Sequence, residues 1–425
     1  MSNLRNVFNG FAAGAALVAA LVTGAPAAAQ STASPADQDS TMVTATPTQA
    51  ALARGSATVV DLSADRADLS PAVNHIVTSV QEALAAKQKV IIMLGEEHGT
   101  INHVRMAELL RIGLHRAGIA NPVMAEEMSA PFLMEELLSI FPEDSQGAFH
   151  TRVMQALKFL EKDDPARHHR LQATMMVAWD STVTPITRLE NMSIWLDEGV
   201  DIRLVDIMKT TARHINSADP ATGAFIDAHS VPDITDKTQI NTTSVEGMRL
   251  RNLWMAAQLR TILSEDKSRV VILQTGGSHI GGRQPTGYPY RHALHGLLAN
   301  AAHDNVKVLT VFQECYGVTF KGFLPVKTQK AMNNPNTIIV RGSYEDQHWQ
   351  GISGSFAREA RALEIFAKRS GMPEAAPHIK NRDDYDARLN KNRGILIKEI
   401  EAVTAQYAPA AQKIASGAVV AAPSP

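Results

Sequence analysis

Strand-length apolar runs alternate with longer amphipathic segments along most of this chain, and that alternation constrains the fold more than any other feature. The runs are mostly apolar, and several are continuously so, which is typical of strands buried on both faces of a parallel sheet. They fall at Val90–Leu94, Pro122–Ala125, Ile202–Asp206, Val270–Leu273, Val306–Val311 and Thr337–Arg341. The pattern predicts an α/β fold, with a mostly parallel central sheet flanked by helices on both faces and a mixed α/β C-terminal extension.

Helical periodicity occupies the segments between these runs. Predicted helices cover approximately residues 102–117, 171–198, 245–263, 290–301, 356–369 and 383–402. Further helical segments follow the run at Pro122–Ala125 and reach about residue 161. The segment Leu171–Glu198 is rich in Met, Ala, Leu and Trp, and it predicts one long helix packed on the sheet.

The N-terminus has the parts of a secretory signal peptide. Arg5 supplies positive charge, an apolar run extends from Phe11 to Val22, and Gly24–Gln30 offers an Ala-x-Ala cleavage site. The apolar run is too short for an ordinary transmembrane helix. We therefore expect residues 1–30 to be removed and the mature protein to be periplasmic or secreted. No cysteine lies near the cleavage site, so we expect no lipid-type membrane anchor.

Composition suggests where the folded part begins and ends. Residues 31–50 are Ser-, Thr-, Ala- and Pro-rich and predict a disordered linker, and residues 408–425 predict a disordered tail. Between them we expect an α/β core at residues 51–317 and an extension of the same domain at residues 318–407. The only cysteine, Cys315, cannot form an internal disulfide, so packing must supply the stability.

Charge is nearly balanced along the sequence. The chain has 41 Lys and Arg residues against 43 Asp and Glu residues, for a formal net charge of −2. This balance gives no electrostatic basis for binding nucleic acid. The expected partner is a small-molecule or peptide substrate.

Acidic and histidine residues gather directly after four of the predicted strands. They occur in Gly95-Glu96-Glu97-His98-Gly99, in Glu126-Glu127, at Asp206 and in Gly276-Gly277-Ser278-His279. Ligands of open parallel sheets bind outside the carboxyl ends of the strands, so we expect these side chains to converge on one edge. A buried cluster of carboxylates and imidazoles costs free energy unless a proton, a metal ion or a substrate compensates.

Such a cluster is compatible with more than one chemistry. A histidine beside a carboxylate can act as a general base on water. The same residue types can ligate a divalent metal ion, which lowers the pKa of bound water. Arg249 and Arg251, on the helix at 245–263, can stabilise a developing oxyanion. A nucleophilic Ser278 is disfavoured, because Ile280 stands where Gly-x-Ser-x-Gly needs its second glycine.

These residues resemble the motifs of the superfamily that contains erythromycin esterases, ChaN-like haem-binding proteins and the TraB/TIKI group. Its Gly-Glu-x-His motif matches Gly95–His98, its acidic residue after the second strand matches Glu127, and its late Gly-x-x-His matches Gly276–His279. Its Arg-Asp-x-x-Met-Ala motif matches Arg251–Ala256, with Asn252 in place of the aspartate. The four matches follow the family's order within residues 90–315. The resemblance implies an α/β hydrolytic scaffold.

The branches of this superfamily imply different reactions. In the esterase branch a histidine is thought to activate water without an obligatory metal, the TIKI branch is metal-dependent, and the ChaN branch is associated with haem. We expect an exported hydrolase of an ester or amide bond, either esterase-like or like a metal-dependent peptidase. The alternative is a haem or metal-ion binding protein that uses the same pocket without turnover. A divalent metal ion is the first candidate cofactor and haem the second.

The expected catalytic residues are His98, Glu96, Glu127, Arg251 and His279. His98 would be the general base or a metal ligand, and Glu96 and Glu127 would orient it or share the metal. His279 would complete the site, and Arg251 would stabilise negative charge. If a metal ion is bound, its expected ligands are His98, Glu127 and His279. A degenerate scaffold without chemistry is a third alternative, which the joint presence of these residues disfavours.

Overall fold

The structure is a computed structural model in which residues 57–96, 100–120, 122–129, 143–179, 186–211, 213–229, 236–237, 240–265, 269–281, 293–298, 305–313, 334–341 and 356–415 are described. All of these belong to one compact unit, Thr44–Pro425. The expected signal peptide, the expected linker and Cys315 lie outside the described residues. No helix within the described ranges has the length and apolar character that crossing a membrane requires.

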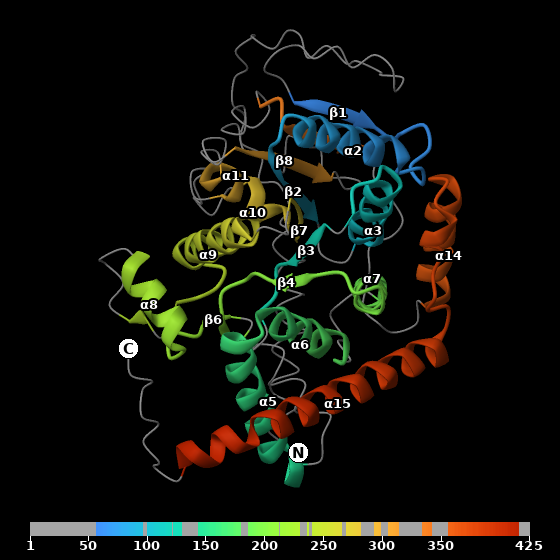
Figure 1. The fold of residues 1–425 in the computed structure, drawn as a ribbon. Helices are drawn as coiled ribbons and strands as arrows, with labels where there is room; N and C mark the ends of the chain where they lie inside the picture. The colour runs from blue at the N-terminus through green and yellow to red at the C-terminus, as the bar shows by residue number, and fades with distance from the viewer. Residues whose placement is uncertain are drawn as a thin grey trace, which may run out of the picture. The chain divides into compact units, whose positions relative to one another are not determined.

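A seven-stranded sheet runs through the described part of the chain (Figure 1). Its strand order is β1-β9-β8-β2-β7-β3-β4, and every neighbouring pair is parallel. The strands are β1 (Thr58–Asp61), β2 (Lys89–Glu96), β3 (Val123–Glu126), β4 (Ile202–Leu204), β7 (Val270–Gly276), β8 (Val306–Gln313) and β9 (Thr337–Arg341). The predicted α/β fold is confirmed. Sequence patterning missed only β1 among these strands, a short edge strand whose side chains are mostly half-buried.

The centre of the sheet contains a topological switch. The consecutive strands β7 and β8 lie on opposite sides of β2, so the chain changes its direction of travel across the sheet at that point. In open α/β sheets such a switch opens a crevice at the carboxyl ends of the strands, where ligands bind. The candidate residues come at or just after the end of β2, the central strand at the switch, and of β7, β3 and β4, the strands on one side of it.

Helices cover both faces of the sheet (Figure 1). One face packs against α2 (Ser70–Ala85), α3 (Ile101–Arg116), α7 (Ile186–Asp197) and α14 (Phe356–Arg369). The other packs against α9 (Val245–Ser264), α10 (Gly277–Gly281) and α11 (Leu294–Leu297). Side chains of β2 alternate between the two cores, as the pleat requires: Ile92 and Leu94 belong to the first, whereas Ile91 and Met93 belong to the second.

The remaining described elements lie beside this sandwich. The helices α5 (Glu143–Asp163), α6 (Pro165–Val177) and α15 (Arg382–Ala415) share an apolar cluster, centred on residues such as Val153, Leu171 and Leu396. The other side of α6 and the start of α15 also contribute to the first core, through residues such as Met176 and Leu389. A small cluster joins α8 (Pro220–His229) and α9 to the antiparallel pair β5 (Lys209–Thr211) and β6 (His214–Ile215).

Two predictions about helices were wrong. The segment Leu171–Glu198 is not one helix, because α6 ends at Val177 and α7 begins at Ile186. Pro185 stands just before α7 and lacks the amide hydrogen that a helix interior requires, which favours a new helix start there. The disordered tail expected at 408–425 was predicted to begin too early in the sequence, because α15 continues to Ala415. An Ala-rich composition resembles a tail, but alanine is also the strongest helix former.

The C-terminal segment is tied to the α3 and α7 side of the sheet by buried polar contacts. Glu359 of α14 is 1% exposed and accepts hydrogen bonds at the start of α7 from Thr187 N (3.2 Å) and Thr187 Oγ1 (3.0 Å). Arg105 of α3 donates to Asn191 Oδ1 of α7 at 2.6 Å and also to the carbonyl oxygen of Ala375. Residues far apart in sequence thus form one polar junction between α3, α7 and the C-terminal segment, made by the contacts of Glu359 and Arg105.

Two glycines on different helices should respond in opposite ways to alanine. A Cβ at Gly247, in the first turn of α9, would lie 1.8 Å from the backbone oxygen of Asn241, whereas a Cβ at Gly394 of α15 would meet nothing within 4 Å. We expect Gly247→Ala to lower the free energy of unfolding by about 1–3 kcal/mol through overpacking. Gly394→Ala should raise it by about 0.5–1 kcal/mol, because it restricts the unfolded chain. Urea unfolding measures both, and shifts of the same sign would contradict the described packing.

Candidate functional site

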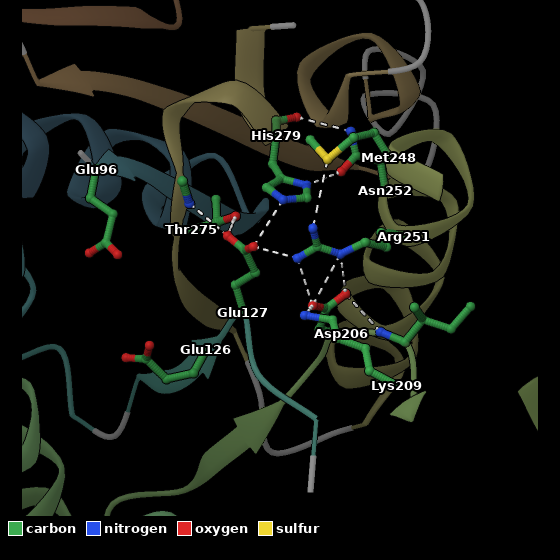
Figure 2. Close-up of polar contacts among 12 residues, drawn as sticks. Glu96, Glu126, Glu127, Asp206, Lys209, Met248, Arg251, Asn252, Thr275 and His279 are labelled. Carbon is green, nitrogen blue, oxygen red and sulfur yellow. Dashed lines mark hydrogen bonds and ion pairs between the residues drawn. The ribbon is translucent and has the colours of Figure 1, made fainter. Parts of the chain in front are cut away.

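The candidate residues at the carboxyl edge separate into two networks, one on each face of the sheet. Glu96 and Gln274 continue the side-chain alternation that faces α7, whereas Thr275 continues the alternation that faces α9. We call Glu127, Asp206, Lys209, Arg251, Asn252 and His279 the α9-face network, and Glu96, Glu126, Arg188 and Gln274 the α7-face network. Figure 2 shows Glu96 and Glu126 lying apart from the contacts around Glu127.

Glu127 is the centre of the α9-face network (Figure 2). Its Oε2 accepts hydrogen bonds from Thr275 Oγ1 and from the backbone nitrogen of Gly276, each at 2.7 Å. Its Oε1 lies 2.5 Å from Arg251 Nη2 and 2.9 Å from His279 Nε2. The carboxylate is therefore held by the end of β7, by α9 and by α10 together.

Arg251 joins Glu127 to Asp206. Its Nη2 lies 2.7 Å from Asp206 Oδ2, its Nε donates to Asp206 Oδ1 at 3.1 Å, and Lys209 Nζ reaches Asp206 Oδ2 at 2.5 Å. Burial would raise the pKa of Asp206, but the charges of Arg251 and Lys209 outweigh it and lower the pKa to about 2. Burial and the charge of Arg251 lower the pKa of Lys209. Arg251 Nη1 has the Met248 thioether, at 3.7 Å, as its partner among the described residues.

His279 is clamped from both sides. Its Nδ1 lies 2.5 Å from Asn252 Oδ1, and Asn252 Nδ2 donates back to the His279 carbonyl oxygen at 3.2 Å. Its Nε2 faces Glu127. Burial lowers the pKa of His279, and the neighbouring carboxylate of Glu127 acts in the opposite direction. Asn252, which stands where the resembled motif has an aspartate, is therefore the residue that orients His279.

The α7-face network is built around Arg188. This buried guanidinium, from the first turns of α7, pairs with Glu96 and lies 3.2 Å from Glu126 Oε2. Gln274 Nε2 donates to Glu96 Oε2 at 2.7 Å. Burial would lower the pKa of Arg188, but Glu96 and Glu126 outweigh it and raise the pKa. One arginine thus pairs with carboxylates from the ends of β2 and β3, the two strands that flank β7.

The structure brings some of the predicted site residues together and separates others. Glu127, Arg251 and His279 form one connected network, which Asp206 joins. Glu96 lies in the α7-face network, across the sheet from them. Arg249 pairs with Glu246 of its own helix, at 2.6 Å from Nε to Oε2. His98 lies outside the described residues, so its role remains a prediction.

Arg188 and Lys209 are the site residues that sequence reasoning missed. Arg188 belongs to no motif, and it lies in the segment 171–198, which was wrongly predicted to be one helix. Lys209 follows the third candidate strand by only a few residues. The available signal was the excess of negative charge: the sequence places five carboxylates after three of the candidate strands, and buried carboxylates require cations close to them.

The described part of the expected metal set, Glu127 and His279, does not by itself form a metal site. Among the residues that the structure describes, no group of three His, Cys, Asp or Glu side chains is arranged to hold one. Glu127 already has four hydrogen-bond partners, and both nitrogens of His279 face protein oxygens. His98, the third expected ligand, is not among these residues.

Comparisons with known proteins leave the chain without an assigned relative. No family model, no curated protein and no solved structure matches it. The resemblance drawn from the motifs therefore stays a prediction.

Proposed function

We propose that this protein is an exported hydrolase that cleaves an ester or amide bond of a small molecule or peptide, with His98 activating water as a general base. One observation carries the proposal. Arg251 is a buried guanidinium at the carboxyl edge of the sheet, and its Nη1 has only a weak thioether partner among the described residues. A strong donor with so weak a partner is suited to a negatively charged oxygen of a reacting substrate.

The surroundings of Arg251 support this role. Hydrolysis by water places negative charge on the carbonyl oxygen as the tetrahedral intermediate forms. Asp206 and Glu127 hold the guanidinium on two sides, so its orientation is set before any substrate arrives. Removing one such preorganised donor typically costs about 10²–10³ in kcat. In this proposal Glu127 and His279 support Arg251 rather than attack the substrate.

His98 supplies the base in this proposal. It follows Glu96 by two residues along the chain, and Glu96 ends β2 at the centre of the sheet. A histidine there would take a proton from water and later return one to the leaving group. Export is also part of the proposal, because residues 1–30 have the signal-peptide pattern. Mass spectrometry of the exported protein should find a chain that begins near residue 31.

Replacing His98 tests the hydrolase proposal. We expect His98→Ala to lower kcat/KM by about 10²–10⁴-fold, because general acid–base groups contribute on that scale. The assay uses the mature protein and a panel of esters, lactones and peptides. His115→Ala is the matched control, since His115 is exposed at the end of α3, and it should change kcat/KM less than about twofold. Full activity in His98→Ala would rule out the proposed base.

The binding alternative gives a different result in the same preparation. A metal and chromophore inventory precedes the assays, and turnover is measured with and without a chelator. A stoichiometric haem spectrum with no turnover on the whole panel would reject the hydrolase in favour of binding. Turnover that survives chelation and depends on His98 would support the esterase-like mechanism.

A further inference from the structure

The start of α7 takes a hydrogen-bond acceptor from a distant part of the chain. The first amide groups of a helix have no acceptor within the helix, and the side chain of the residue just before it often supplies one. Here that residue is Pro185, whose side chain has no polar atom. Glu359 Oε2 of α14 accepts from Thr187 N at 3.2 Å and from Thr187 Oγ1 at 3.0 Å. The C-terminal segment therefore caps α7.

Two further contacts hold the same side of α7. Glu190 Oε1 accepts from the backbone nitrogen of His378 at 2.5 Å. Asn191 Oδ1 accepts from Arg105 Nη1 at 2.6 Å, and that guanidinium also donates to a carbonyl oxygen of the C-terminal segment. Thr187 precedes Glu190 and Asn191 by three and four residues, so all three lie along one side of the helix. The C-terminal segment and α3 together fix where α7 begins and how it is turned.

Arg188 connects this capped helix start to the carboxyl edge of the sheet. It follows Thr187 directly, and successive helical side chains project about 100° apart, so it leaves the capped side of α7. Its guanidinium pairs with Glu96 and lies 3.2 Å from Glu126 Oε2. All three of these side chains are buried, and a buried carboxylate that loses its cation is strongly disfavoured. A shift of the α7 start would therefore disturb both strand ends.

We propose that Glu359 is a positioning residue of the candidate site: by capping the start of α7, it holds Arg188 against the two carboxylates at the ends of β2 and β3. The C-terminal segment thus acts on the carboxyl edge through α7. Glu96 ends β2 two residues before His98, the proposed base, so a displaced Arg188 would disturb the strand end that leads to the base. That catalytic consequence rests on the proposed function, whereas the placement of Arg188 does not.

Nitrogen NMR of the mature protein labelled with ¹⁵N-arginine tests the placement at pH 7. Arg188→Lys and Arg251→Lys identify the two guanidinium signals. Glu359→Leu removes both acceptor oxygens, and we expect the Arg188 guanidinium hydrogens to exchange with solvent at least about tenfold faster than in wild type. Arg251 belongs to the α9-face network, so its exchange should change less than about twofold. Glu359→Gln keeps an acceptor for Thr187 and should restore the slow exchange of Arg188.

Activity measures the catalytic consequence on whichever ester, lactone or peptide turns over. We expect Glu359→Leu to lower kcat/KM by about 10–10²-fold, since small displacements of supporting groups cost on that scale. In an Arg188→Lys background the same change should lower kcat/KM less than about twofold further, because the effect passes through Arg188. Asn392→Leu is the control. It removes another contact of the C-terminal segment, an amide that donates to Val177 O and to Ser193 Oγ of α7, and its effect should stay below about twofold.

The outcomes separate this inference from misfolding and from the proposed function. Thr187→Val removes only the hydroxyl and should speed Arg188 exchange to a smaller extent, so it serves if Glu359→Leu does not fold. Unchanged Arg188 exchange in both variants, or equal acceleration of Arg188 and Arg251, would overturn the inference. A loss of kcat/KM in Asn392→Leu as large as in Glu359→Leu would overturn the catalytic consequence. Faster Arg188 exchange in a protein that hydrolyses nothing on the panel would reject the proposed function and leave the placement of Arg188 standing.

Discussion

Replacing Arg251 with methionine is expected to lower the free energy of unfolding by about 3–5 kcal/mol, the usual effect of removing one partner from a buried ion pair. Arg251 is the cation that Asp206 and Glu127 share, at 2.7 Å and 2.5 Å from Nη2. Without it, both carboxylates would stay buried, with Asp206 dependent on Lys209 alone for opposite charge among the described contacts. Urea unfolding at pH 7 measures the loss.

Arg249 provides a matched control on the same helix. Its guanidinium is half-buried and pairs with Glu246, three residues earlier in the chain. Partly exposed ion pairs within one helix contribute little to the free energy of unfolding, so Arg249→Met should change it by less than about 1 kcal/mol. Combining Arg251→Met with Asp206→Asn should recover part of the loss, because the uncompensated charge is removed as well. An Arg251→Met effect no larger than that of Arg249→Met would refute the central place given to Arg251.

Replacing Glu359 with glutamine is expected to stabilise the protein by about 3 kcal/mol at pH 9 and to have little effect at pH 4. Burial raises the pKa of Glu359 from its ordinary value of 4.5 to about 7, although the hydrogen bonds from Thr187 act in the opposite direction. Its Oε1 is buried and has no hydrogen-bond partner among the residues that the structure describes. A carboxyl whose pKa is raised by folding favours the folded state when protonated, so its contribution is complete below pH 4.5 and is lost as the pH rises through 7.

Glutamine resembles the protonated carboxyl at every pH, so the variant should escape this loss. The free energy of unfolding of wild type and variant is measured by urea unfolding between pH 4 and pH 9, and the difference should grow mainly between pH 5 and pH 8. Glu364→Gln is the control, because Glu364 is exposed on the same helix, and its effect should not vary with pH across that range. A constant difference between wild type and Glu359→Gln would show that Glu359 does not ionise within the junction.

The parallel sheet could be predicted because each strand carries its own evidence. Continuous apolar runs such as those in β2 and β7 are required wherever both faces of a strand are covered, and that requirement is local to the run. The same runs located the carboxyl edge, so the sequence also indicated that Glu127, Asp206 and His279 would lie near one another. The motif resemblance added Arg251 to the candidate site, whereas hydrophobic periodicity does not distinguish Arg251 from Arg249 on the same helix.

Local patterns did not separate Glu126 from Glu127, nor did they reveal the two networks. Adjacent residues at a strand end point to opposite faces, and the sequence contains no mark of which helix covers which face. Arg188 was missed for the same reason: its partners Glu96 and Glu126 precede it by 92 and 62 residues in the chain. Such pairings depend on strand register and helix packing, which are properties of the whole fold.

The sequence by itself determined the α/β class, the positions of the long strands and the edge at which charged residues gather, because hydrophobic periodicity records burial residue by residue. Tertiary structure alone decided which carboxylate meets which cation. Glu127 lies with Arg251 and His279, and Glu96 with Arg188, because the sheet separates its two faces and α9 and α7 each supply one arginine. The same packing turned Asn252, a departure from a motif in the sequence, into the residue that holds His279.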